Sequence, residues 1–469
     1  MAEVEGAGQV GSRRDLLLFS ATVTSIGAAL WLLLRNSPQT VAGTIFMATV
    51  LGTLMFWRFR LAIAFAGIGA LLATQTIDVE HMIGFMSVDV ITFLASMMIL
   101  VEIAKEGGFF KWLLSRLLAA VRYDPRKVMI ILLAMSTLMA AMVDEVTSII
   151  FITAIVFEYC RRFELDPVPF VISTVLATNV GSSATMLGNP IGILIGLRAG
   201  LTFENFLLCA TPVAVLSLAV IIALCTLWYR KPLRGARAKV KSMEENNRGS
   251  VGWGGGVSPR EVRLSGALLL STVFMIAIHY RLELLLNVEK STFLLVAAYM
   301  GAAMGMLWKR RDARPIVERG VDWWTLVFFM FLFAKAGALK YTGLTDVLAS
   351  GIASVASSQS QIQALVLWFG GFASSVLDNV VLVAALIPVV QSLGALGFSM
   401  TPLWWALLFG GTYGGNITMI GSTANIVALG MLEKEFRYYM KFFKWLPIGL
   451  LGGILPMLVA QVWLAVFFH

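Results

Sequence analysis

Residues 181–192 read GSSATMLGNPIG and residues 414–425 read GGNITMIGSTAN, and each stretch lies between strongly apolar runs. Glycine, proline, serine and asparagine interrupt a helix. A helix interrupted at membrane depth leaves backbone N–H and C=O groups that are costly unless protein, ion or water satisfies them. Each break is therefore expected to line a polar cavity, where backbone carbonyls and Ser, Thr and Asn oxygens suit a small hard cation.

The composition around these breaks is that of a membrane protein. The chain has 469 residues, of which 58% are hydrophobic and 13% charged, and its mean hydropathy is +0.83. Runs such as 16–34, 205–229 and 445–468 are long enough to cross a bilayer. The sequence predicts an all-α polytopic membrane protein with about 11 transmembrane helices and excludes an ordinary soluble globule.

Several other classes of protein find no support. The three cysteines and three histidines follow no ligand spacing, so neither a transition-metal site nor an organic cofactor is expected. The net charge of +9 comes from basic residues in short loops between apolar runs, a pattern that sets membrane orientation and does not indicate nucleic acid as a partner. No nucleophile–base constellation is present, so the chain is not expected to be an enzyme.

The basic loops also predict the topology. They place the N-terminus in the cytoplasm and the C-terminus outside, in what we expect to be the inner membrane of a prokaryotic cell. Reading 127–160 as a full crossing would put Arg161 and Arg162 outside, so we interpret it as a re-entrant hairpin. The segment 361–394 is expected to be a second hairpin that enters from the outside.

The predicted organisation follows from this layout. In chain order it comprises an N-terminal cytoplasmic tail with scaffold helices (1–80), a first repeat (81–229) with an inner hairpin (127–160) and a broken helix (168–198), a flexible, Gly-rich and basic cytoplasmic linker (230–263), further scaffold helices (264–320), and a second repeat (321–469) with an outer hairpin (361–394) and a broken helix (402–432).

The two halves repeat at a constant spacing. VDVITFLASMM from Val88 corresponds to VDWWTLVFFMF from Val321, and TMLG from Thr185 corresponds to TMIG from Thr418, both 233 residues apart. In the predicted layout the two copies cross the membrane in opposite senses. Such an inverted-topology repeat is typical of secondary transporters, whose substrate sites form near the bilayer midplane from broken helices.

Carboxylates lie at both hairpin tips. Asp144 and Glu145 stand in MVDEVTS, Asp378 and Asn379 stand in SSVLDNV, and the two aspartates are 234 residues apart. A carboxylate at membrane depth costs about 2.5–3.5 kcal/mol or more, so it is usually functional, and here it would bind a cation or carry a proton. The alternative is that these acids only pair with a nearby lysine or cap a half-helix.

Five further charges are weaker candidates: Asp89, Glu102, Asp322, Lys335 and Lys340. Each lies within about two turns of an expected helix end, where a charged side chain can reach the membrane interface. We therefore interpret them as interfacial.

The motifs LDPVPFVISTVLATNVGSSATMLGNPIGILIG, from Leu165, and LDNVVLVAALIPVV with PLWWALLFGGTYGGNITMIGSTANIVALG, from Leu377 and Pro402, carry a resemblance. Over about residues 80–468 the chain resembles the ion transporter superfamily, most closely its arsenite-efflux-permease and pink-eyed-dilution (P) protein branch. D-type sodium/proton antiporters and divalent anion/sodium symporters are relatives. The resemblance implies a homodimer whose protomers each hold a scaffold domain and a transport domain that moves like an elevator.

The resemblance also implies two ion and substrate sites, each between a hairpin tip and the adjacent helix break, with Na⁺ or H⁺ as the coupling ion. The implied residues are Asp144, Glu145, Thr147, Asn179, Gly181, Ser183, Thr185, Gly188 and Asn189 in the first site, and Ser375, Asp378, Asn379, Thr412, Gly414, Asn416, Thr418, Gly421, Ser422 and Asn425 in the second.

The first site departs from the family pattern twice. The usual Asp-Asn of the hairpin is Asp144-Glu145, and the usual Gly-Asp-Pro-Pro-Asn of the break is Gly-Asn-Pro-Ile-Gly at 188–192. Both changes alter the oxygen ligands, so the ion stoichiometry of the first site is left open.

The carboxylates also bear on the cargo. The symporter relatives carry dicarboxylates past neutral Ser-Asn-Thr tips, whereas acidic tips would repel a dianion unless cations or protons compensate. The sequence therefore favours a secondary active transporter that exports a metalloid oxyacid such as arsenite or silicate, or that exchanges cations for protons. A sodium-coupled carboxylate or anion symporter is the alternative, and a gated ion channel is the second alternative.

Overall fold

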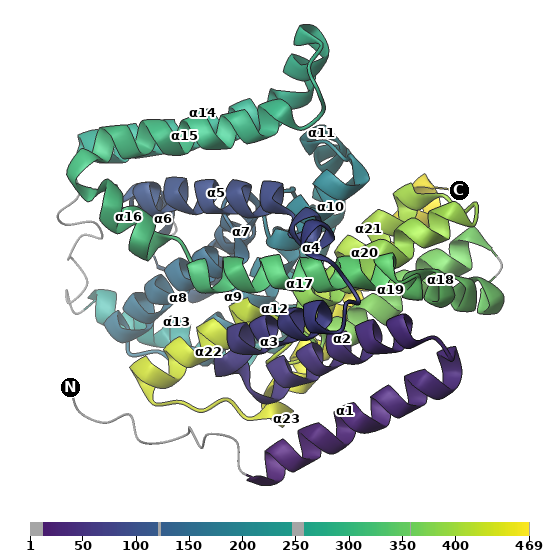
Figure 1. Ribbon diagram of the computed structural model, residues 1–469. Coiled ribbons are helices and arrows are strands. Elements are labelled where there is room, and N and C mark those ends of the chain that lie inside the picture. Colours follow the sequence, from purple (N-terminus) through teal and green to yellow (C-terminus); the bar gives the residue numbers. More distant parts are fainter. Residues whose placement is uncertain (1–12, 121–122, 246–257, 357, 469) are drawn as a thin grey trace. The chain divides into compact units, whose positions relative to one another are not determined.

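The computed structural model describes residues 13–120, 123–245, 258–356 and 358–468. These residues form helices joined by short connections, and no strand occurs among them (Figure 1). In the described part of the chain, eight helices are long and apolar enough to cross a membrane, or nine if the bent pair α4 (Val79–Phe85) and α5 (Val88–Glu106) forms one span. The prediction of an all-α polytopic membrane protein is confirmed, and the exact number of crossings stays a prediction.

The helices form two compact units. Unit 1 contains the described residues up to Ile91 together with Trp323–Val355 and Ala384–Gly397. Its elements, besides α4 and the start of α5, are α1 (Arg13–Leu34), α2 (Ser37–Met55), the 3₁₀ turn η1 (Trp57–Phe59), α3 (Arg60–Ala73), α17 (Trp323–Tyr341), α18 (Leu344–Val355) and most of α20 (Asn379–Ala395). Within this unit α17 packs on α2, α3, α4 and α18.

Unit 2 contains Thr92–Asp322, Ala356–Val383 and the described residues from Phe398 onward. Its elements, besides most of α5, are α6 (Phe109–Ala120), α7 (Pro125–Met142), α8 (Glu145–Arg162), α9 (Val168–Ser182), α10 (Pro190–Ala199), α11 (Phe203–Asn205), the π turn η2 (Phe206–Ala210), α12 (Thr211–Trp228), α13 (Arg230–Glu245), α14 (Pro259–Leu286), α15 (Thr292–Lys309), η3 (Arg310–Asp312), α16 (Ala313–Gly320), α19 (Gln359–Ser374), the start of α20 (Asn379–Ala395), α21 (Met400–Gly414), α22 (Thr423–Phe436) and α23 (Phe442–Phe467).

Helices begin and end close to the residues expected for the hairpins and breaks. In the first half α7 and α8 pack together, and α9 is separated from α10 by residues 183–189. In the second half α19 is followed by α20, and residues 415–422 separate α21 from α22. The boundaries of the predicted domains and the membrane orientation of each segment stay predictions.

In each half, a hairpin arm packs closely against a broken helix at a glycine. α7 packs on α9, and a Cβ added to Gly181 would lie 2.4 Å from the Thr137 carbonyl oxygen. α19 packs on α21, and a Cβ added to Gly414 would lie 2.0 Å from the Gly371 carbonyl oxygen. Only glycine lets the two backbones approach this closely, so each hairpin arm is held directly against its break.

One segment differs from its prediction. The stretch 230–263 was expected to be a flexible linker, but Arg230–Glu245 forms α13. Leu233 and Val240 lie two helical turns apart on one face and are buried, while two basic residues form ion pairs with acids of unit 2. The apolar face and these ion pairs stabilise a helix that the high charge of the segment conceals. The part of the linker from 246 to 257 lies outside the described residues.

Candidate functional site

Every residue predicted for the two sites lies in unit 2. All of them are buried except Asp144, Thr147 and Asp378, which are partly exposed. A buried polar group is stable only when it is hydrogen-bonded, so the partners of these residues define the site.

The two tip aspartates make the same local contact. Asp144 Oδ1 accepts the backbone N–H groups two and three residues later at 2.8 Å each, at the start of α8. Asp378 Oδ1 accepts the corresponding N–H groups at the start of α20, at 2.9 and 3.3 Å. Both aspartates are therefore helix N-caps, so the capping role considered as an alternative does occur for one oxygen of each acid.

Each tip also contacts its own break. Thr185 Oγ1 donates to the carbonyl of Ala141 near the end of α7, and Thr418 Oγ1 donates to the carbonyl of Ser375 after α19. These contacts recur at the repeat spacing. In the second half Thr423, the first residue of α22, adds a hydroxyl that lies 3.3 Å from Asp378 Oδ2. The hairpin tips and the breaks therefore meet, as the resemblance implies.

The two tips contact each other through the residues that follow the aspartates. Asn379 Nδ2 donates to Glu145 Oε1 at 3.4 Å, and both residues are at least 97% buried. The second oxygen of each group, Glu145 Oε2 and Asn379 Oδ1, has no hydrogen-bond partner among the described residues. This is a buried carboxyl group beside a buried amide, with one unsatisfied oxygen on each.

The two breaks share a cluster of buried asparagines. Asn179 Nδ2 lies 2.7 Å from Asn416 Oδ1 and 2.9 Å from Asn425 Oδ1, and Ser422 Oγ donates to Asn179 Oδ1 at 3.1 Å. Asn425 Nδ2 also donates to two carbonyls of the second break, at 2.7 and 2.8 Å. This cluster fixes the first break against the second, so the two breaks form one polar centre.

Other predicted residues have local roles. Asn189 caps α10 by accepting the Gly192 N–H at 2.7 Å. The hydroxyls of Ser375 and Thr412 donate to carbonyls of their own helices at 2.6 and 2.8 Å. Thr147 interacts with Asp144 through both its backbone N–H and its side chain. The structure brings the tips, breaks and asparagines together, and the ligand role of these hydroxyls stays a prediction, since each keeps its acceptor lone pairs.

Gly188 and Gly421 also have backbone roles. A Cβ added to Gly188 would lie 2.2 Å from the carbonyl oxygen of Ser182 at the end of α9, and one added to Gly421 would lie 2.8 Å from the carbonyl oxygen of Gly415 in the second break.

Three residues of the site were missed. Ser183 Oγ lies 2.9 Å from Tyr413 OH, and Trp445 Nε1 donates to the Asn416 carbonyl at 3.0 Å. Tyr413 and Thr423 stand inside or directly beside the quoted GGNITMIGSTAN motif and could have been found there. Trp445 lies in α23, where no pattern of the sequence singles it out.

Lys335 was expected to be interfacial, and this was wrong. It lies in α17 of unit 1 and is 1% exposed. Its Nζ donates to Thr49 Oγ1 at 3.0 Å and to the Ala64 carbonyl at 3.3 Å. A Cβ on Gly67 would come within 3.2 Å of Nζ, so this glycine leaves room for it. Distance from a helix end does not reveal that α2 and α3 cover the side chain.

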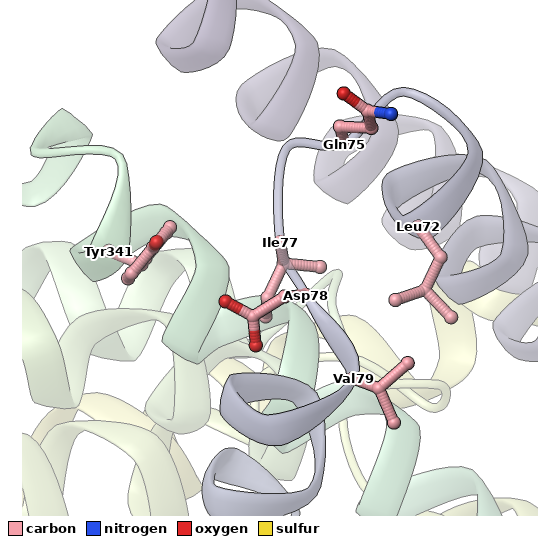
Figure 2. A pocket seen from close by; sticks show the side chains of 6 residues that line it. All are labelled: Leu72, Gln75, Ile77, Asp78, Val79 and Tyr341. Carbon is pink, nitrogen blue, oxygen red and sulfur yellow. The ribbon is translucent and has the colours of Figure 1, made fainter.

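An open pocket of about 400 Å³ lies in unit 1, and none of the predicted site residues lines it. Figure 2 shows Leu72 and Val79 on one side of it and Tyr341 on the other. Its carboxylate, Asp78, caps α4. Hydrogen bonds from the backbone and side chain of His81 hold the pKa of Asp78 below its usual range. The carboxylate of Asp78 is therefore already engaged by hydrogen bonds within its own helix.

The fold and the site define the class of protein. Among the described residues no group of three or more His, Cys, Asp or Glu side chains is placed to hold a metal ion. The buried polar centre, built from interrupted helices of a polytopic membrane protein, is that of a transporter. The chain belongs to the citrate transporter family, whose sequence model matches residues 45–410 and 355–468. It thus belongs to the ion transporter superfamily, in the P protein-like branch, and is a non-enzymatic integral membrane protein.

Individual relatives agree with this assignment. An uncharacterized transporter of Mycobacterium bovis is 31% identical over 353 residues, which cover 74% of this chain and 78% of that protein. The P protein of Homo sapiens is 26% identical over 511 residues, which cover 91% of this chain but only 59% of P protein. The structure of the YdaH transporter of Alcanivorax borkumensis matches with a TM-score of 0.54 at 18% identity, covering 86% of this chain and 89% of that one. This last likeness shows the fold.

Proposed function

We propose that the chain is a secondary active transporter coupled to protons or sodium, with its ion and cargo sites where the hairpin tips meet the helix breaks. The observation that supports this most is the tip-to-tip contact, where Glu145 Oε2 and Asn379 Oδ1 are buried without partners. Unsatisfied buried oxygens are costly. Where the two tips meet, beside the aspartates, such oxygens suit a cation or a proton bound during function, which is what coupling requires.

The charge of the tips supports a cargo that is not an anion. Asp144 and Asp378 both act electrostatically on Glu145, so three carboxylates share one region of unit 2. In a site of low dielectric a further negative charge is repelled strongly. The proposed cargo is a small metalloid oxyacid such as arsenous or silicic acid, which is uncharged near neutral pH, or a cation exchanged for protons.

A second candidate is a sodium-coupled carboxylate symporter. The match to a family described as citrate transporters favours it. It requires that bound cations neutralise the tip carboxylates before the substrate enters. The symporter would therefore bind citrate only in the presence of sodium or at low pH, whereas an oxyacid exporter would not respond to citrate at all.

The proposal extends to movement and assembly. We propose a homodimer in which the breaks and tips move together across the membrane, since the asparagine cluster joins the first break to the second. We also propose a prokaryotic inner membrane location, with a cytoplasmic N-terminus and an external C-terminus. Labelling of single cysteines introduced at exposed basic loops from either side of the membrane tests this orientation.

Flux into proteoliposomes tests the function. A pH or sodium gradient is imposed, and labelled arsenite, silicic acid, citrate and a monovalent cation are supplied in separate experiments. One of these cargoes should accumulate above its equilibrium level. Dissipating the gradient with an ionophore should remove the accumulation. Ohmic current without uphill movement of any cargo would instead establish the gated channel.

A further inference from the structure

The contact between the tips contains one of the two hydrogen bonds that a carboxylic acid and a primary amide can form with each other. One side chain, Asn379, donates an amide N–H to Glu145 Oε1. The remaining atoms of the two groups are Glu145 Oε2 and Asn379 Oδ1, and both are acceptors without a donor. Glu145 comes from α8 and Asn379 from the start of α20, so the two groups belong to different hairpins.

A carboxylic acid and a primary amide are complementary. The acid O–H donates to the amide oxygen while the amide N–H donates to the acid carbonyl, so two parallel hydrogen bonds form. One proton on Glu145 Oε2 would thus provide the donor that Asn379 Oδ1 lacks and would turn Oε2 into a donor. A carboxylate cannot do this, because it accepts only.

The surroundings disfavour a charge on Glu145. Burial has the largest effect, and the two charged groups that act on it electrostatically are the carboxylates of Asp378 and Asp144, while the Asn379 amide and the nearby Ser182 hydroxyl act in the opposite sense. Of the helices that pack on α8, α9 carries no charged side chain, and the charged residues of α7 and α22 lie at the ends remote from the tip. The start of α20 is likewise uncharged, and the charged residues of α8 itself, Glu158, Arg161 and Arg162, lie more than three turns away.

We propose that Glu145 is a proton site shared by the two tips: it binds one proton as a carboxylic acid and closes a two-point pair with Asn379. The inference rests on the proposed function and specifies its coupling ion. The proton is added to Oε2 and leaves from it, and no other bond changes. This site joins one tip to the other, whereas the two sites implied by the resemblance each join a tip to its own break.

The pair also has a mechanical consequence. With the proton bound, two hydrogen bonds hold the hairpins together. Once the proton is lost, one hydrogen bond remains, from Asn379 to Glu145 Oε1, against two opposed acceptor oxygens and three carboxylates, so the tips are free to separate. Proton loss and opening of the tips are therefore one event, which is how a gradient can drive a conformational cycle.

Glu145→Gln tests the proton site without removing the pair. A glutamine amide forms the same two hydrogen bonds with Asn379 at any pH. Wild-type protein in detergent should have a higher unfolding temperature as pH falls, because the native state takes up the proton. Glu145→Gln should keep the high unfolding temperature of the acidic form, and its dependence on pH should be smaller than that of the wild type. An unchanged pH dependence in this variant would overturn the proposal.

Glu283→Gln is the matched control. Glu283 is a second buried acid of unit 2; it accepts the Phe293 N–H at 2.9 Å, and its other oxygen has no partner among the described residues. Its glutamine variant should retain the wild-type pH dependence. If Glu283→Gln removed that dependence instead, the proton would belong elsewhere and the proposal would fail.

Two further measurements separate the proton from sodium and the inference from the proposed function. The first measurement compares sodium chloride with choline chloride at a pH where Glu145 has lost its proton. Any rise in unfolding temperature caused by sodium should be the same in the wild type and in Glu145→Gln. Stabilisation by sodium that Glu145→Gln abolishes would assign a metal cation to the site and overturn the proposal. In proteoliposomes, Glu145→Gln should lose proton-driven accumulation. If wild-type protein itself moved no cargo uphill, the proposed function would fail, whereas the pH-dependent unfolding would still test the proton site.

Discussion

The first and second hairpin tips share an aspartate N-cap and differ at the next residue. Asp144 and Asp378 each cap the second arm of a hairpin with one oxygen. The following residue is an acid, Glu145, in the first tip and an amide, Asn379, in the second. The shared aspartate caps a helix in both tips, so the chemical difference between the two halves lies in the residue that follows it.

Neutralising the aspartates should produce the largest effect and should separate the tips. Asparagine caps a helix as well as aspartate does, so Asp378→Asn should keep the fold while removing the charge. It leaves no carboxylate in the second tip, and gradient-driven uptake should fall to background. Asp144→Asn leaves Glu145 in the first tip and should retain part of the uptake. Both are measured as initial rates in proteoliposomes.

Asp378→Ala and Asp144→Ala provide the control, because alanine removes both cap and charge. Each should cost about 0.5–2 kcal/mol of stability in addition. Normal coupled transport by Asp378→Asn would remove this carboxylate from the mechanism, and equal loss in the two asparagine variants would mean that the tips do not differ as proposed.

Closing the glycine contacts should have the next largest effect. Gly414→Ala and Gly181→Ala push a methyl group against a backbone carbonyl that cannot yield, which costs roughly 1–3 kcal/mol or more. Gly414→Ala should be the more severe, because its contact is 2.0 Å rather than 2.4 Å. Gly430→Ala, with open space around it, is the matched control and should be harmless. Fluorescence-detected thermal unfolding in detergent ranks the three variants.

Glu102→Gln should have the smallest effect. Glu102 and Lys335 are 233 residues apart and so occupy matched positions of the repeat, but Glu102 pairs with Lys105 at 2.8 Å near the surface. An exposed ion pair contributes about 0.2–1 kcal/mol. Uptake and the unfolding temperature should stay close to wild type. A large loss of transport would show that this position, too, belongs to the mechanism.

Much of the fold could be predicted from the sequence. Hydrophobic runs long enough to cross a bilayer determine an all-helical membrane protein, and Gly-Asn-Pro at 188–190 marks a helix start, with Asn189 as the cap. The tips could be located because polar residues interrupt long apolar arms. The meeting of tips and breaks was implied by the resemblance, and the hydrogen bonds of Thr185 and Thr418 agree with it.

The rest depends on contacts between segments far apart in the chain. No local pattern shows that Asn379 reaches Glu145, or that Trp445 reaches a carbonyl of the second break, because these pairs are set by how whole helices pack. The burial of Lys335 could not be predicted for the same reason, because the residues that bury it belong to α2 and α3, far from it in the chain. In α13, Leu233 and Val240 recur at helical spacing, so the sequence held a signal for this helix that the many basic residues outweighed in our prediction.

The tip-to-tip contact joins positions 145 and 379, which the 234-residue spacing makes equivalent. In an assembly of two identical halves such a position would meet its own copy, giving acid against acid or amide against amide. A pair made of one acid and one amide requires that the two copies be encoded separately. Two halves carried by one chain can differ at such a position, and position 145 is a place where that freedom could alter which ion drives the cycle.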